Sequence, residues 1–421
     1  MAVNIGDSVG IDINSLVSSI EDMMPRDLLI SSKCCIFKTP SILYRHNEKA
    51  YIPDAFSIGP LHHGSPNLEA IEKIKAKYLQ GLISRLNSPE LLRTLIKSIM
   101  EVEKDARECY AEAIDYNLEQ LVKILVIDGY FIIELFCKKI YWRLTEERDP
   151  IFSRSCMLQF LYHDLILLEN LIPWMVLERL FNLTMDSYDE NPLILLAVNF
   201  FRTIHFSKRL RPRDQVINIK GIEHLVDLFR KLWISSIEEE RERRREWELL
   251  PSATSLAEAG IKFKKGTSKT VLEVKFNDGI LEIPSFEIHE ITETVFRNLI
   301  SYEQCLPNSD DRITSYAILL DSLINTAKDI DILYESEIID NWLNPEDAAQ
   351  LFNKLYLDTC VAYHYNDLCT QVNSYCRRRW PRWRAVLAHN YFNTPWAFIS
   401  TLAAFILLLL TLLQTVYTMK N

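Results

Sequence analysis

The stretch HDLILLENLIPW, residues 163–174, sets three polar side chains among leucine, isoleucine and tryptophan: Asp164, Glu169 and Asn170. A carboxylate buried in such surroundings is costly unless it is paired or hydrogen-bonded. Asp164 and Glu169 are five residues apart, about 140° around a helix, so they do not share one helix face. This spacing favours an architectural role for the stretch over a paired acid and base.

A second stretch of the same kind lies upstream, because LVKILVIDGYFIIELF (residues 121–136) also places carboxylates among apolar residues. Helix-end caps, or pairing with Arg202 or Arg297, would satisfy such groups. Pro173 interrupts the helix expected to carry the Glu169 carboxylate, and an amide there can satisfy the freed carbonyls. We therefore predict one structural polar network, made of Asp128, Glu134, Asp164, Glu169 and Asn170.

The alternative interpretation is a hydrolase-like enzyme built on these carboxylates, which requires two of them to converge on an open cleft. Phosphate-binding loops of the GxxxxGK[ST] and GxGxxG types are absent, as is a GxSxG nucleophile elbow. His289-Glu290 begins a zinc-protease pattern, but Glu293 stands where the second histidine is required. We assign no catalytic residue, no cofactor and no metal ligand.

The rest of the body also reads as mainly helical. The chain has 421 residues, enough for two average domains or one large one, and only 10 of them are glycine. Residues 69–86 place apolar side chains on one side and Lys73, Lys75 and Lys77 elsewhere, the pattern of an amphipathic helix. We expect further helices at residues 90–114 and 118–142.

One section departs from this helical pattern. Residues 236–248, SIEEERERRREWE, contain oppositely charged pairs four residues apart, which predicts a solvated helix over about 236–250. After the short helix expected in SATSLAEAG, two alternating segments flank Asn277-Asp278-Gly279. Alternation on both sides of such a turn predicts a β-hairpin at about 271–286.

The C-terminal region predicts a membrane anchor. Residues 396–416, WAFISTLAAFILLLLTLLQTV, contain no charge and would span roughly 30 Å as a helix, so a transmembrane helix is expected at 395–417 and membrane lipid as its partner. The preceding basic cluster indicates a single-pass protein whose body faces the cytosol. That cluster consists of Arg377, Arg378, Arg379, Arg382 and Arg384.

The expected organisation is a flexible N-terminal segment (1–25), a helical body (26–390), the transmembrane helix and a short tail (418–421). The fold class is thus mainly α, with a multi-helix globular body, a small β-hairpin element and one C-terminal transmembrane helix. A net charge of −10 argues against nucleic-acid binding. The nine cysteines show no framework spacing, which indicates reduced thiols.

Several segments resemble, in order, a plant family called domain of unknown function 247, and the similarity runs from about residue 26 to residue 417. They are IGPLHHGSPNLEAIEKIKAKYL, VIDGYFIIELF, DLILLENLIPWMVLERLF, SATSLAEAGIKFK, LEIPSFEI, TETVFRNLISYEQC and NTPWAFISTLAAFILLLLTLLQTVY. The resemblance implies a plant membrane-associated protein without accepted catalytic residues. Some relatives are linked to pollen self-incompatibility in grasses. Leu171 departs from the family pattern, which usually has glutamine there.

From these observations we expect a non-enzymatic recognition or scaffold protein that binds an unidentified protein partner through its helical body. A second alternative keeps the recognition role but places the body outside the cytosol, as in the self-incompatibility relatives. Asn182-Leu183-Thr184 is the only glycosylation sequon, so a glycan on Asn182 would support that orientation.

Overall fold

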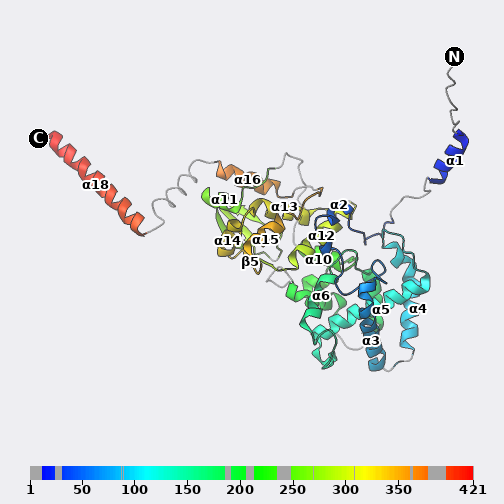
Figure 1. The fold of residues 1–421 in the computed structure, drawn as a ribbon. Helices are drawn as coiled ribbons and strands as arrows, with labels where there is room; N and C mark the ends of the chain where they lie inside the picture. Colours follow the sequence, from blue (N-terminus) through cyan, green and yellow to red (C-terminus); the bar gives the residue numbers. More distant parts are fainter. Residues whose placement is uncertain are drawn as a thin grey trace, which may run out of the picture.

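Helices dominate the computed structural model, with a few short strands in the C-terminal half of the body (Figure 1). The structure describes residues 12–23, 31–86, 88, 90–184, 191–204, 213–234, 248–268, 270–307, 309–360, 364–377 and 395–420. The helix α1 (Ile13–Met23) falls within the segment expected to be a flexible extension, and it stands apart from the body.

The N-terminal half of the body consists of helices and short 3-10 turns. They are α2 (Ser41–Tyr44), η1 (Glu48–Ala50), η2 (Pro66–Leu68), α3 (Glu69–Leu86), α4 (Leu91–Glu108), α5 (Leu118–Ile140), η3 (Trp142–Leu144), α6 (Ser155–Asp164), α7 (Trp174–Thr184), α8 (Leu193–Phe200), η4 (Phe201–Ile204), α9 (Arg213–Ile217) and α10 (Leu225–Ile234).

The C-terminal half adds five strands to a further set of helices. Its elements are α11 (Ala253–Glu258), β1 (Lys262–Gly266), β2 (Lys275–Asn277), β3 (Ile280–Pro284), β4 (Phe286–Ile288), α12 (Thr292–Cys305), α13 (Arg312–Leu323), α14 (Ala327–Glu335), β5 (Ile339–Asn341), α15 (Pro345–Phe352), α16 (Asn366–Cys376) and α18 (Pro395–Lys420).

Helix α5 is the centre of the N-terminal half, with α3, α4, α7 and α8 packed around it. It begins at a capping box, in which Asn117 Oδ1 accepts the Gln120 N–H at 2.9 Å and Gln120 Oε1 accepts the Asn117 N–H at 3.0 Å. Gly129 lets α7 approach closely, because a Cβ at that position would lie 2.6 Å from Leu180 Cδ1. Most of α5 is buried, which explains why its sequence is apolar on nearly every face.

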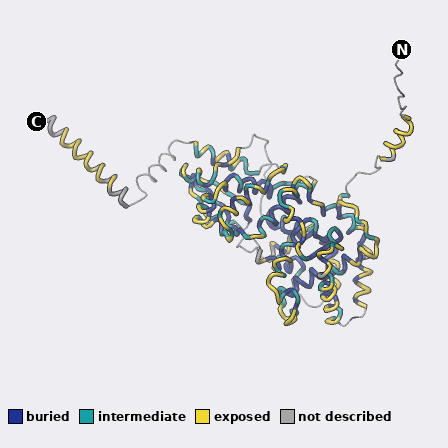
Figure 2. The backbone as a smooth tube through the Cα atoms, in the orientation of Figure 1, coloured by how far each residue is buried: buried dark blue, intermediate teal, exposed yellow. Residues whose placement is uncertain are grey.

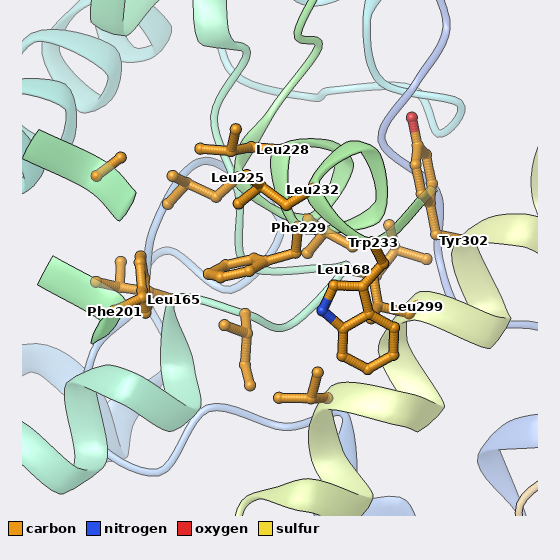
Figure 3. Close-up of a cluster of buried hydrophobic side chains, with 14 of the residues drawn as sticks. Leu165, Leu168, Phe201, Leu225, Leu228, Phe229, Leu232, Trp233, Leu299 and Tyr302 are labelled. Carbon is orange, nitrogen blue, oxygen red and sulfur yellow. The ribbon is translucent and has the colours of Figure 1, made fainter. Parts of the chain in front are cut away.

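Apolar side chains from separate parts of the chain, including Phe201 of η4, meet where α10 packs on α12 (Figure 3). Helix α10 contributes Leu225, Leu228, Phe229, Leu232 and Trp233, while α12 contributes Leu299 and Tyr302. The non-helical segment after α6 contributes Leu165 and Leu168. This cluster joins the two halves through a continuous hydrophobic core.

The strands form one three-stranded and one two-stranded sheet. β2 and β3 are antiparallel around Asp278-Gly279, whose φ values of 43° and 83° match the turn that such a dipeptide favours. β1 runs parallel to β3, and β4 runs parallel to β5. The sequence predicted only the hairpin, because parallel partners come from distant segments and have no local turn signal.

The prediction of a C-terminal transmembrane helix was wrong. In the part of the chain that the structure describes, no helix combines the length and the apolar character needed to cross a membrane. Helix α18 (Pro395–Lys420) does form at the predicted place. The expected single-pass location, with the body facing the cytosol, is corrected with it. Figure 2 shows that the described residues of α18 are exposed.

Two predicted charged segments lie largely outside the described residues. They are the run at 236–250, of which only residues 248–250 are described, and the basic cluster, of which only Arg377 is described. Arg377 is exposed, and its Nη2 lies 3.1 Å from both carboxylate oxygens of Glu248. This pairing ties the end of α16 to the start of the segment that leads into α11.

Candidate functional site

The predicted polar residues gather around one irregular segment, residues 50–59, which we call the buried segment. After η1 ends at Ala50, it contains no helix or strand, yet most of its residues are buried. Buried backbone N–H and C=O groups need partners, and secondary structure supplies none here. Side chains from distant helices and loops supply them instead.

Asp164, the last residue of α6, binds the middle of the buried segment. Its carboxylate accepts the backbone N–H groups of Asp54, Ala55 and Phe56 at 2.8, 2.9 and 2.7 Å. The neighbouring His163 Nδ1 lies 2.8 Å from the same carboxylate. Four close partners leave this fully buried group no room to act as a general base.

Asn170 binds the same segment two residues further on. Its Oδ1 accepts the Ile58 N–H at 2.6 Å, and its Nδ2 donates to Phe56 O and Asp164 O, each at 2.8 Å. The Asp164 carbonyl is one of those left free where α6 ends. One buried amide thus closes a helix end and fixes the buried segment at the same time.

Asp128 and Lys75 form a buried ion pair beneath the end of the buried segment. Lys75 Nζ lies 2.7 Å from Asp128 Oδ1, and the two side chains are 0% and 1% exposed. Gly59 N–H donates to Asp128 Oδ2 at 2.8 Å, while the ammonium also binds Ser57 O and Glu72. Burial raises the pKa of Asp128, and the nearby Lys75 charge opposes that rise.

Gly59 is required where it stands, because its φ of 73° is left-handed and a Cβ would lie 2.3 Å from the Leu171 carbonyl. Leu171 itself is buried, and its carbonyl accepts the Tyr110 hydroxyl at 3.0 Å. The leucine that replaces the usual glutamine of the resembling family therefore fills a packed position.

The other two predicted carboxylates, Glu134 and Glu169, bind groups outside the buried segment. Glu134 receives a two-pronged contact from Arg85, with both N···O distances 2.8 Å, and the Tyr130 hydroxyl at 2.8 Å. Glu169 accepts the Thr39 N–H at 2.9 Å, with His62 Nε2 3.9 Å away, and burial raises the pKa of Glu169. The structure therefore brings together Asp128, Asp164 and Asn170, but not all five.

A pocket of about 220 Å³ opens beside Glu134, which is the only predicted carboxylate among the residues that line it. Its other buried carboxylate, Asp149, accepts the Tyr78 hydroxyl and the Lys138 ammonium, each at 2.8 Å. Because each acid already has strong donors, the pocket does not provide the free acid–base pair that a hydrolase requires.

The suggestion that the buried carboxylates pair with Arg202 or Arg297 was wrong. Arg297 pairs with Glu293 at 2.7 Å, four residues away on α12, and Arg202 is exposed. The cations that pair with the network, Lys75 and Arg85, lie on α3, where we expected lysines on the solvated face. A usable signal existed, because Lys75 lies four residues after Ile71 and three before Tyr78, and residues so spaced share one helix face.

Two clusters of ligand-type side chains also occur among the described residues, Cys35 with Glu223 and His224, and Asp54 with His163 and Asp164. In the first, His224 Nε2 lies 2.9 Å from Cys35 O, and its Nδ1 accepts the Asp227 N–H at 3.1 Å. In the second, Asp164 is held by backbone N–H groups as described above. Both clusters are therefore satisfied by protein contacts.

Because His224 is buried, we expect the stability of the protein to fall at acid pH. Burial lowers its pKa from 6.5 to about 4, so the unfolded chain takes up the proton more readily. The contribution of neutral His224 to the free energy of unfolding is fully present above pH 6.5. It should fall by about 3 kcal/mol as the pH drops towards 4. Denaturant unfolding at several pH values measures this fall. His224→Asn, which keeps a donor and an acceptor, should remove this part of the pH dependence; an unchanged pH dependence would contradict the assignment.

Comparison with known proteins places the chain. The model of the family DUF247, described as a plant protein of unknown function, matches residues 36–410. The chain belongs to this plant family. The chain is 27% identical over 411 residues to UPF0481 protein At3g47200 of Arabidopsis thaliana, covering 91% of this chain and 85% of that protein.

A second protein of Arabidopsis thaliana is also similar to this chain. Putative UPF0481 protein At3g02645 is 24% identical over a 498-residue alignment, which covers 95% of this chain and 92% of that protein. No solved structure matches the chain. Because the family has no assigned function, a function for this DUF247 member has to be argued from its own residues.

Proposed function

We propose that this protein is a non-enzymatic recognition or scaffold protein that binds a protein partner through its helical body. The buried carboxylates support the first part of the proposal. Asp128, Asp164 and Glu134 are each engaged by cations or backbone N–H groups. Groups held in this way stabilise a fixed surface and are not available to a substrate.

The observation that carries the binding role is an exposed apolar stripe on α4. Leu92, Ile96 and Met100 recur every four residues and are 37, 38 and 49% exposed. The adjoining face of α4, including Leu95 and Ile99, is buried and packs against α5 and α7. Figures 1 and 2 place α4 at the outer edge of the body. An apolar stripe that stays exposed beside the buried face of a surface helix is typical of protein-binding surfaces.

The charges beside the stripe indicate the chemistry of the partner. Arg93, Lys97 and Lys104 are exposed on the side of the stripe that lies away from the core. Arg93 is paired with Glu90, whereas neither Lys97 nor Lys104 has an ion-pair partner among the described residues. The stripe therefore suits an amphipathic helix that carries acidic residues along one edge.

Proximity labelling in intact plant cells, with the tag on the N-terminus, tests the proposal. The double variant Ile96→Glu/Met100→Glu should fold with a stability within about 1 kcal/mol of the parent, since both side chains are exposed. In this variant, the labelling of the principal protein neighbour should fall at least tenfold. Tyr334→Glu, an exposed change on α14, is the control and should keep that labelling. An unchanged set of neighbours in the double variant would refute the α4 surface.

A further inference from the structure

The N-terminal end of the body is fastened to the end of α4 by an isolated parallel bridge between Ile36 and Tyr110. Cys35 N–H and Ile36 N–H both donate to Cys109 O at 2.9 Å, and Ala111 N–H donates to Ile36 O at 2.9 Å. Cys35 and Cys109 directly precede the two bridged residues, so they are neighbours across this bridge. Paired strands lie about 4.7–4.9 Å apart. That spacing falls within the Cα separation of about 4.4–6.8 Å that a disulfide spans.

The two thiols also meet. The Cys35 thiol is hydrogen-bonded to Cys109, and the Cys109 thiol donates to Asp105 O at 3.3 Å. The hydrogen bond from Cys35 lowers the pKa of Cys109, whereas the same bond and burial raise the pKa of Cys35. Cys109 is therefore the thiol that ionises first, and Cys35 is placed to react with it.

We propose that Cys35 and Cys109 form a reversible disulfide when the protein meets hydrogen peroxide. The Cys109 thiolate attacks one peroxide oxygen, the O–O bond breaks, and the hydroxide that leaves takes up a proton to become water. The sulfur of Cys35 then attacks the resulting sulfenic acid of Cys109. The S–O bond breaks, and the oxygen leaves as a second water that carries the Cys35 proton. Two thiols and one peroxide thus give one disulfide and two waters.

The disulfide would have a structural effect because it closes a loop of about 75 residues, from Cys35 to Cys109, that contains the buried segment, α3 and the whole of α4. Closing so long a loop restricts the unfolded chain strongly. The oxidised protein should therefore melt several degrees higher than the reduced protein. The bond would also fix the start of the body against α4, the helix that carries the proposed binding stripe.

The test uses the purified full-length chain, either reduced with dithiothreitol or treated with a small excess of hydrogen peroxide. Free thiols are alkylated in denaturant, and unreduced tryptic peptides are analysed by mass spectrometry. We expect the peptide CCIFK (residues 34–38) linked to ECYAEAIDYNLEQLVK (residues 108–123) as the main cross-linked product, with the link removed by dithiothreitol. The mapping on the parent chain depends on no substitution that could impair folding.

Because the first peptide holds two cysteines, variants identify the one that reacts. Cys34→Ser is the matched control and should keep both the link and the oxidative rise in melting temperature. Cys35→Ser should lose both effects. A link that survives in Cys35→Ser and disappears in Cys34→Ser would overturn the assignment. Alkylation of both Cys35 and Cys109 in the parent after peroxide treatment would also overturn it.

Discussion

Replacing Asp164 with alanine is expected to lower the free energy of unfolding by about 3–5 kcal/mol. The substitution leaves the backbone N–H groups of Asp54, Ala55 and Phe56 without their acceptor in a dry interior. Each unsatisfied buried donor costs about 1–3 kcal/mol, and partial relaxation keeps the total below the simple sum. Urea unfolding followed by circular dichroism measures the loss.

Glu101→Ala is the control for this experiment, because Glu101 is an exposed carboxylate that forms a surface ion pair with Arg179. Its removal should change the free energy of unfolding by less than about 1 kcal/mol. If the Asp164→Ala variant unfolds at the same urea concentration as the parent, Asp164 does not hold the buried segment. The explanation of the opening stretch would then be wrong.

The second large effect is expected at the buried ion pair. Lys75→Met should destabilise the protein by about 3–5 kcal/mol, because it leaves the Asp128 carboxylate buried without its cation. Adding Asp128→Asn removes that charge but keeps an acceptor for the Gly59 N–H. The double variant should therefore recover about 2 kcal/mol or more of the loss.

Lys73→Met is a matched control on the same helix, since Lys73 is exposed. It should leave the unfolding midpoint within about 0.5 kcal/mol of the parent. Equal effects of Lys73→Met and Lys75→Met, or a double variant no more stable than Lys75→Met alone, would show that the pair contributes no specific coupling.

Local sequence patterns predicted much of the helical body, and the reason is visible in α3 and α5. The apolar pattern that predicts each of them is a local property of the chain. The stretch HDLILLENLIPW (residues 163–174) is different. Residues 165–173 were expected to include a helix, yet they form a buried loop held by tertiary contacts, for instance from Asn298 to Leu168 N–H at 2.8 Å.

The candidate site was predictable by residue type but not by partner. Carboxylates and an amide among apolar residues predict a buried polar network, because buried polar groups need hydrogen-bond or ion-pair partners wherever they lie. What they bind cannot be inferred from local spacing, since most of their backbone partners lie 69 to 130 residues away. The parallel bridge between Ile36 and Tyr110, which places Cys35 beside Cys109, could not be predicted from the sequence for the same reason.

The buried segment has a consequence for how the chain folds as it is synthesised. Residues 50–59 leave the ribosome early, but the Asn298 amide that donates to Ala50 O at 2.7 Å follows 248 residues later. At about 5–20 residues per second, the delay is roughly 12–50 s. During that time the Ala50 carbonyl binds water, and the nascent N-terminal half cannot close its connection to α12. Completion of this domain is therefore tied to late translation, which makes the waiting intermediate a natural client for chaperones.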